Sequence, residues 1–370
     1  MSELSPFMRA ALEAAESVRG STSPNPWVGA VVVKDGEIVA RGATSPPPGL
    51  HAEAVAISAD IPDGATLYVT LEPCAPFPGK RTPSCAMRII ERGIRNVVVA
   101  LEDADPRVAG QGIAMLREAG VAVEVGDGRE AVMRSLRPYL KHRQTGTPYV
   151  VAKFAASLDG RISANSGDSK WITGPAAREM VHKERARVDA ILTGSGTVIA
   201  DDPALTARTG GVLPERQPVR VVVDSRGRIP PEAQVLHGPG RAIVATASNA
   251  PAEWRRAITE TGATVLACGR SGGGVDLKHL LETLGEQGFL SVWVEGGGTL
   301  LGALFDDGHV DELWAFLAPR IIGGDGKPAV AGAGFERVAD AHRLREVVVE
   351  QVAEDVLVRG YTGPWDYDDA

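Results

Sequence analysis

His51-Ala52-Glu53, together with Pro73-Cys74 and Cys85, is the part of the sequence that decides how this chain is organised. One imidazole and two thiols supply three zinc ligands, and a tetrahedral zinc ion then keeps its fourth position for water. A structural zinc site would fill all four positions with protein. Glu53 follows His51 by two residues, so its carboxylate can reach that water without ligating the metal. The pattern therefore predicts a catalytic zinc centre.

The order H-x-E followed by P-C is the signature of zinc-dependent nucleobase deaminases, in which the metal activates water and the Glu transfers its proton to the departing amine. The alternative is structural, because lone cysteines in a cytosolic protein are usually small buried apolar residues. The combined order of the four residues favours the metal site. One departure is the spacing, because deaminases commonly place two residues between the cysteines. Here the run from Ala75 to Ser84 intervenes, so the ligands come from the two ends of a longer loop.

Composition restricts the class of protein. The 370 residues predict two or three domains, and an apolar fraction of 44% is ordinary for a globular chain. The net charge of −8, without a stripe of Lys or Arg, argues against nucleic-acid binding. No apolar run approaches the roughly 20 residues of a membrane span, and the N-terminus does not resemble a secretory signal. With two cysteines assigned to zinc and Cys268 expected to be buried and inert, the chain has no disulfide framework, which indicates a cytoplasmic protein.

The first half of the sequence alternates between helical and strand patterns. A helix is expected from Ser5-Pro6, followed by strands at 28–33 and 38–40 around a hairpin turn, a helix at 51–58, a strand at 66–70, a helix at 85–92 and strands at 96–100 and 121–125. His51 and Cys85 therefore lie at helix starts, where the positive end of the helix dipole favours thiolate over thiol. The alternation predicts a mixed sheet covered by helices on both faces.

The apolar pattern lapses between Tyr139 and Pro148, where polar and turn residues predominate. We place the domain boundary there, giving domains at 1–146 and 147–363, and expect the acidic tail at 364–370 to be disordered. A second α/β alternation follows. Its expected strands are 149–155, 189–193, 219–224, 242–245, 264–267, 291–295 and 312–317, and its expected helices are 175–187, 251–261, 276–287 and 299–307.

Two glycine-rich turns follow strands of the second half. No G-x-G-x-x-G follows the first strand, so a Rossmann dinucleotide site has no support. Gly296-Gly297-Gly298 instead ends a strand and begins a helix, which suits either a dinucleotide phosphate or a tight structural turn. A second glycine turn at 194–197 favours a cofactor cleft. Trp171 is able to stack on a ring, but an isolated Trp is more often a core residue, and we prefer that interpretation.

Together these motifs resemble the bifunctional riboflavin-biosynthesis deaminase/reductase family. The first half carries TSPNPWVGAV at 22–31, HAE at 51–53 and TLEPC at 70–74, and the second half carries SLDGR at 157–161, SKWIT at 169–173, GTV at 196–198, ADDP at 200–203, LTAR at 205–208 and EGG at 295–297. The resemblance runs over nearly the whole chain in the family's domain order. It implies an α/β protein with a cytidine-deaminase-like N-terminal domain and a dihydrofolate-reductase-like C-terminal domain.

The resemblance also implies two consecutive reactions. Zinc-dependent hydrolysis would deaminate 2,5-diamino-6-ribosylamino-4(3H)-pyrimidinone 5′-phosphate, and NADPH would then reduce the ribosyl side chain of 5-amino-6-(5-phosphoribosylamino)uracil to ribityl. We expect the small-molecule partner to be this phosphorylated pyrimidine substrate. We also expect the chain to form a homo-oligomer. The alternatives are a related deaminase/reductase for another pyrimidine nucleotide, which the altered loop after Cys74 would support, and a catalytically dead sensor of flavin precursors, against which the intact zinc motif argues.

Residue roles follow from the resemblance. His51, Cys74 and Cys85 would bind zinc, Glu53 would shuttle the proton, and Asn25 would contact the base. NADPH would contact Ala155, Trp171, Thr197, Asp201, Ser225, Gly297, Gly298, Thr299, Leu300, Leu301, Gly302 and Ala303. The reductase substrate would contact Ser169, Arg185, Leu205, Arg208 and Glu295. The two arginines suit a phosphate because a planar guanidinium forms forked hydrogen bonds to it.

One feature of the family is missing. Between the zinc cysteines the family usually carries a His followed by Gly-Arg/Lys-Thr, whereas this chain lacks the His and has a longer loop. Lys80 and Arg81 are the candidates to take over the phosphate contact in the deaminase site.

Overall fold

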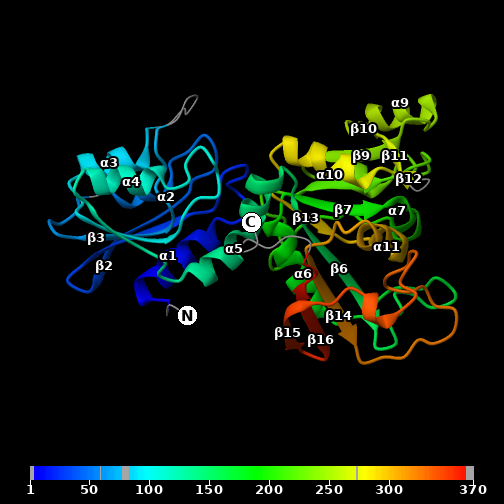
Figure 1. Ribbon diagram of the computed structural model, residues 1–370. Coiled ribbons are helices and arrows are strands. Elements are labelled where there is room, and N and C mark those ends of the chain that lie inside the picture. The colour runs from blue at the N-terminus through cyan, green and yellow to red at the C-terminus, as the bar shows by residue number, and fades with distance from the viewer. Residues whose placement is uncertain (1–3, 59, 77–82, 272–273, 364–370) are drawn as a thin grey trace. The chain divides into compact units, whose positions relative to one another are not determined.

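The structure, a computed structural model, describes residues 4–58, 60–76, 83–271 and 274–363 (Figure 1). The chain divides into two compact units, Met1–Gly146 and Thr147–Ala370. In the described residues, no helix combines the length and the apolar character that crossing a membrane requires. Lys80, Arg81 and the tail at 364–370 lie outside the described residues, so their predicted roles stay predictions.

The first unit is a five-stranded mixed sheet with helices on both faces, which confirms the expected architecture. Its strands are β1 Gly29–Lys34, β2 Glu37–Ala43, β3 Thr66–Leu71, β4 Asn96–Leu101 and β5 Ala122–Val125, in the order β2-β1-β3-β4-β5. Its helices are α1 Pro6–Ser17, α2 Ala52–Ala56, α3 Cys85–Glu91, α4 Gln111–Glu118 and α5 Arg129–Thr145. Strand β1 runs antiparallel to β2 and β3, whereas β3, β4 and β5 are parallel. Figure 1 shows α2, α3 and α4 on one face and α1 and α5 on the other.

Two glycines allow helices to approach this sheet closely. A Cβ on Gly29 would lie 1.9 Å from the carbonyl oxygen of Ala11 in α1, and a Cβ on Gly42 would lie 2.2 Å from that of Ala52 in α2. No side chain fits in either gap. Because α2 is held this close to β2, the position of its first turn, which carries Glu53, is fixed by backbone packing.

Helix α5 corrects one sequence-based expectation. It runs through the segment from Tyr139 to Thr145, where we expected the pattern to lapse. Leu136, Tyr139 and Leu140 bury one face of its last turns, so the polar residues between them lie on the other face. The helix ends at Gly146, whose φ of 75° is the left-handed conformation typical of a helix C-terminus.

The second unit contains a nine-stranded sheet. Its strands are β6 Tyr149–Ser157, β7 Ala190–Gly194, β8 Val219–Val223, β9 Ala242–Ala247, β10 Thr264–Cys268, β13 Ser291–Val294, β14 Glu312–Ala318, β15 Arg345–Val352 and β16 Asp355–Tyr361, in the order β10-β9-β8-β7-β13-β6-β14-β16-β15. The helices are α6 Pro175–Arg187, α7 Ser195–Asp201, α8 Gln234–His237, α9 Ala252–Glu260, α10 Leu277–Glu286 and α11 Gly298–Asp306, with a 3-10 turn at Val338–Asp340. Two short strands, β11 Arg270–Ser271 and β12 Gly274–Val275, pair with each other.

Within this sheet, neighbouring strands are parallel along β10-β9-β8-β7-β13-β6-β14. Strands β16 and β15 add an antiparallel edge. All strands and helices expected in this half are present. Strands β15 and β16 were not expected, because β15 is exposed over most of its length and lacks an apolar alternation. The carboxyl ends of β7, β13 and β6 meet at one edge of the sheet, which is where open α/β sheets bind ligands. Cys268 is buried at the end of β10, as expected.

Gly302 supplies a test of the packing around α11. A Cβ at this position would lie 1.3 Å from the carbonyl oxygen of Ala331, so alanine should force the two segments apart and cost about 1–3 kcal/mol. Gly196 in α7 is the matched control, because a Cβ there would have no neighbour within 4 Å. Thermal denaturation should show a lower melting temperature for Gly302→Ala and an unchanged or slightly higher one for Gly196→Ala. Equal melting temperatures would contradict this account.

Candidate active sites

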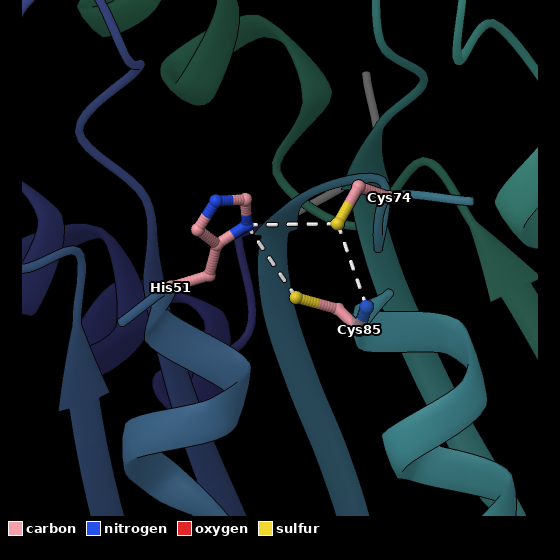
Figure 2. A group of neighbouring side chains, drawn as sticks. All are labelled: His51, Cys74 and Cys85. Atoms are coloured by element: carbon pink, nitrogen blue, oxygen red, sulfur yellow. Dashed lines mark hydrogen bonds between the residues drawn. The ribbon is translucent and has the colours of Figure 1, made fainter. Parts of the chain in front are cut away.

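The three predicted zinc ligands converge in the first unit. Figure 2 shows the Nδ1 atom of His51 facing both sulfurs, at 3.6 Å from Cys74 Sγ and 3.5 Å from Cys85 Sγ. The three ligand atoms lie within 4.8 Å of one another. Tetrahedral zinc with Zn–S bonds of about 2.3 Å and Zn–N bonds of about 2.0–2.1 Å places nitrogen and sulfur about 3.5 Å apart. The residues therefore fit a zinc ion without rearrangement.

Helix starts hold these ligands in place. His51 is the N-cap residue of α2, and Cys85 is the first residue of α3. Cys74 lies just beyond β3, where its carbonyl oxygen accepts a hydrogen bond from Ser84 Oγ at 2.7 Å and its sulfur accepts one from the Cys85 N–H at 3.4 Å. The positive ends of two helices therefore meet at the thiols, as the sequence predicted, and favour their ionised form.

The two thiols are strongly coupled. A hydrogen bond with Cys85, helped by His51, lowers the pKa of Cys74 to about 3 despite burial. The same hydrogen bond, together with burial, raises the pKa of Cys85. The pair thus gives up one proton readily and retains the second. A divalent cation displaces such a proton, because only thiolates ligate the metal.

Glu53 lies in the first turn of α2 and is only 3% exposed. Burial raises the pKa of its carboxyl group to about 7, and the neighbouring Cys74 acts in the same direction. A carboxyl group in this range can accept and return a proton near neutral pH.

Asn25 lies in the loop before β1. Its backbone carbonyl accepts a hydrogen bond from Thr22 Oγ1 at 3.0 Å, and the preceding carbonyl, of Pro24, accepts one from Arg143 at 2.8 Å. The loop is therefore held by one bond within itself and by one from Arg143 in α5. Contact between Asn25 and the base stays a prediction.

A second site lies in the other unit, at the carboxyl ends of its central parallel strands. It is a cavity of about 920 Å³, large enough for a small-molecule ligand together with part of a cofactor. Many of the predicted NADPH and substrate residues line it: Ala155, Ser169, Trp171, Arg185, Thr197, Asp201, Leu205, Arg208, Glu295 and Gly297. Segments far apart in the sequence thus form one site, as the glycine-rich strand ends predicted.

The glycine turn at the start of α11 contributes one open position. A Cβ on Gly297 would meet only Thr197 Oγ1, at 3.7 Å, so the absence of a side chain leaves space beside the helix start. Other predicted cofactor residues lie away from the described cavity wall. Gly298 and Gly302 pack against the backbone at 328–332, Leu300 and Leu301 are in the core, Thr299 is exposed, Ala303 is half-buried, and Ser225 accepts a hydrogen bond from Val275.

The guanidinium of Arg185 is engaged within the protein. Its Nε and Nη2 atoms donate to the two oxygens of Glu295 at 2.6 and 2.8 Å, and Nη1 donates to the carbonyl oxygen of Thr206 at 3.0 Å. The forked face expected to hold a phosphate is therefore directed at a carboxylate. Arg208, by contrast, is exposed and forms no hydrogen bond or ion pair with any described residue.

Glu295 is a largely buried carboxylate at the centre of this cluster, with a side chain that is 12% exposed. Burial alone would raise its pKa, but Arg185 and Lys153 outweigh burial and lower the pKa to about 2. The Nζ atom of Lys153 lies 3.9 Å from Glu295, and Trp293 donates its indole N–H at 2.9 Å.

Trp171 corrects the preference for a core position. Its side chain is 63% exposed at the cavity, and the guanidinium of Arg178 lies 4.5 Å from its ring centroid. The indole ring of Trp171 is therefore available to a planar ligand.

Ser169 and Asp201, predicted for substrate and cofactor respectively, are joined by a hydrogen bond of 3.1 Å.

Many residues of the cavity wall were not predicted from the sequence, and among them are Lys153, Arg178 and His182. Lys153 interrupts the apolar run of β6, and a lysine inside a buried strand is a recognisable signal. Arg178, His182 and Arg185 recur on α6 at the spacing that places side chains on one face of a helix. Burial lowers the pKa of both Lys153 and His182.

Comparison with known proteins agrees with these two sites. Residues 1–101 match the family model of the cytidine and deoxycytidylate deaminase zinc-binding region, and residues 148–358 match that of the RibD C-terminal domain. The riboflavin biosynthesis protein RibD of Escherichia coli K12 is 41% identical over 364 residues, covering 95% of this chain and 97% of that protein. The Chlamydia pneumoniae protein of the same name is 43% identical, covering 89% of this chain and 88% of its own.

Solved structures lead to the same family. Acinetobacter baumannii RibD superposes with a TM-score of 0.86 at 37% identity, covering 96% of this chain and 97% of that one. A Thermotoga maritima diaminohydroxyphosphoribosylaminopyrimidine deaminase/5-amino-6-(5-phosphoribosylamino)uracil reductase superposes with a TM-score of 0.83 at 34% identity and the same coverage. The expected fold class and the two expected cofactors, zinc and NADPH, are confirmed. The chain belongs to the RibD family of bifunctional riboflavin-biosynthesis proteins, with a deaminase domain followed by a reductase domain.

Proposed function

We propose that His51, Cys74, Cys85 and Glu53 carry out the deamination of 2,5-diamino-6-ribosylamino-4(3H)-pyrimidinone 5′-phosphate. The observation that carries this assignment is the approach of one nitrogen and two sulfurs within 4.8 Å of one another beside a buried carboxyl group. We further propose that the domains are residues 1–146 and 147–363. The deaminated product is reduced in the cavity of the second domain.

In the deaminase site, each residue has a separate task. His51, Cys74 and Cys85 hold zinc, which when bound supplies Lewis-acid activation of water. Glu53 accepts a proton from the attacking water and passes it to the pyrimidine amine, which leaves as ammonia while a carbonyl forms. Burial of Glu53 supports this role, because a carboxyl group shielded from bulk solvent exchanges its proton within the site.

In the reductase site, NADPH when bound would supply a hydride to C1′ of the opened ribosyl group, where ring opening has left a C=N bond, and the protein must supply one proton to the nitrogen of that bond. Lys153 is the proposed donor, because its ammonium group lies in the cavity beside the carboxylate of Glu295. Arg185 then acts by holding Glu295, and Arg208 is the proposed phosphate contact.

The lack of a disulfide among the three cysteines, all of which lie in the described residues, supports the proposal of a cytoplasmic location, as does the composition. The clustering of all four deaminase residues argues against a catalytically dead sensor.

Two substitutions separate metal binding from proton transfer. Cys85→Ser should remove zinc and abolish deamination, because a hydroxyl is a poor zinc ligand. Glu53→Gln should keep zinc and still lower deamination by roughly 10²–10⁴-fold, because only the proton shuttle is lost. Metal analysis and ammonia release measure the two effects, and reduction of directly supplied intermediate is the control for folding. Full zinc occupancy in Cys85→Ser, or near-normal deamination in Glu53→Gln, would refute the corresponding role.

Arg208→Ala tests the phosphate contact. Losing one charge-assisted hydrogen bond to phosphate costs about 1.5–3 kcal/mol, so the reductase KM for the phosphorylated intermediate should rise roughly ten- to a hundredfold. Deamination should continue, and the ribosylaminouracil phosphate should accumulate. Arg256→Ala, an exposed arginine on α9 away from the cavity, is the matched control. An unchanged KM for Arg208→Ala would place the phosphate elsewhere.

A homo-oligomer is proposed from the edge of the nine-stranded sheet. Strand β15 is outermost, and its residues Val347, Val348 and Val349 are 50%, 43% and 66% exposed. An apolar edge strand of this kind readily pairs with another chain. Light scattering should therefore give at least twice the monomer mass, and Val349→Lys should shift the population towards monomer. A monomeric wild-type chain would end this proposal.

A further inference from the structure

Glu72 is the one charged residue of the Thr70–Cys74 motif, and the mechanism assigns it no task. It directly follows β3, is 3% exposed, and forms no ion pair with any described Lys, Arg or His. Its carboxylate instead accepts four backbone N–H groups. Oε1 accepts from Gly112 at 2.8 Å and Ile113 at 3.1 Å, and Oε2 accepts from Gly110 at 2.8 Å and Asp103 at 3.2 Å. These bonds compensate the cost of burying its charge.

Two of these bonds replace a missing helix cap. Helix α4 begins after Gly110, an N-cap residue without a side chain to accept hydrogen bonds. Gly112 and Ile113 are the second and third residues of the helix, whose N–H groups an N-cap side chain ordinarily satisfies. Glu72 supplies that acceptor from 40 and 41 positions away in the sequence. Its negative charge also suits the positive end of the helix.

The other two bonds close a loop over the zinc ligands. Asp103 and Gly110 stand near the two ends of the connection between β4 and α4, and both donate to the same oxygen of Glu72. Between them, Val108 is 4% exposed and packs in one cluster with Cys74 and Cys85. The loop therefore covers both thiols with an apolar side chain.

The start of α4 also contacts the residue before the first thiol. A Cβ on Gly112 would lie 1.8 Å from the carbonyl oxygen of Pro73, so the helix backbone packs directly on this peptide. On its other side, Cys74 is held by hydrogen bonds from Ser84 and Ala86 to its carbonyl oxygen. Cys74 is thus fixed between α3 and the part of α4 that Glu72 caps.

We propose that Glu72 is a positioning residue of the zinc centre. By capping α4 and closing the loop at 102–110, it fixes Cys74 and keeps Val108 over the two thiols. It acts through these residues and makes no contact with substrate. The inference rests on the proposed zinc role of Cys74 and Cys85, but it does not depend on which pyrimidine is deaminated.

Glu72→Gln is the test, because it preserves the shape and replaces one acceptor oxygen with an amide that opposes the backbone N–H groups. Residues that orient metal ligands typically contribute 10–100-fold to metal affinity or activity. We expect zinc release to a chelator to be at least about tenfold faster, and the absorption spectrum of the cobalt-substituted protein to change. Amide hydrogen exchange at Gly110 and Gly112 should accelerate. For deamination, kcat should fall by a larger factor than KM changes, and the rate of reduction should be unaffected.

Asp224→Asn is the matched control. Asp224 is a fully buried carboxylate of the second unit that accepts the backbone N–H groups of Arg228 and Ile229. Its substitution removes similar bonds, so zinc release and the cobalt spectrum should stay at wild-type values.

Val108→Ala keeps the carboxylate and tests the cover directly, which also serves if Glu72→Gln fails to fold. It should accelerate zinc release while exchange at Gly112 stays slow. Wild-type zinc release and an unchanged cobalt spectrum in Glu72→Gln, with faster amide exchange, would reduce Glu72 to a helix cap and overturn the proposal. Wild-type release in Val108→Ala would overturn the covering role. If wild-type protein leaves the pyrimidine unchanged while these zinc effects occur, the proposed function fails and this inference stands.

Discussion

The first unit depends on bringing one imidazole nitrogen to 3.5 and 3.6 Å from two sulfurs, the nitrogen–sulfur spacing of a tetrahedral zinc shell. Two neighbouring thiolates in an apolar interior are unfavourable unless their negative charge is compensated. Helix starts supply part of this compensation, and close backbone packing supplies the precision. Gly42 lets α2 lie on the sheet, and Gly112 lets α4 lie on the peptide before Cys74. The sheet acts as a rigid base whose ends hold the ligands.

The second unit uses a different constraint, a buried ion pair. Arg185 and Glu295 lie 110 residues apart in sequence and form two hydrogen bonds, and their side chains are only 14% and 12% exposed. Buried pairs of this kind contribute little net stability, because desolvation offsets their attraction. Here the pair fixes a carboxylate beside Lys153, and all three residues line the cavity.

The limits of sequence reasoning follow from the same physics. The clustering of the three proposed zinc ligands was predictable because their residue types and order are chemically restrictive, and most strands were predictable from apolar runs. The partner of Arg185 was not, because a guanidinium suits a phosphate and a carboxylate equally well and only the fold decides between them. The exposure of Trp171 and the length of α5 depend on which face a neighbour covers. Strand β15 has little burial, so it leaves little pattern in the sequence.

The long connection between the zinc cysteines illustrates how local geometry can be independent of loop length. The two ends of this connection are joined directly, since Ser84 Oγ and the Ala86 N–H bond to the carbonyl oxygen of Cys74, and the Cys85 N–H bonds to its sulfur. Closing the loop at its base fixes the separation of the two sulfurs, whatever number of residues lies between them. The approach of His51, Cys74 and Cys85 is therefore compatible with a connection that is longer than usual and lacks the family's histidine.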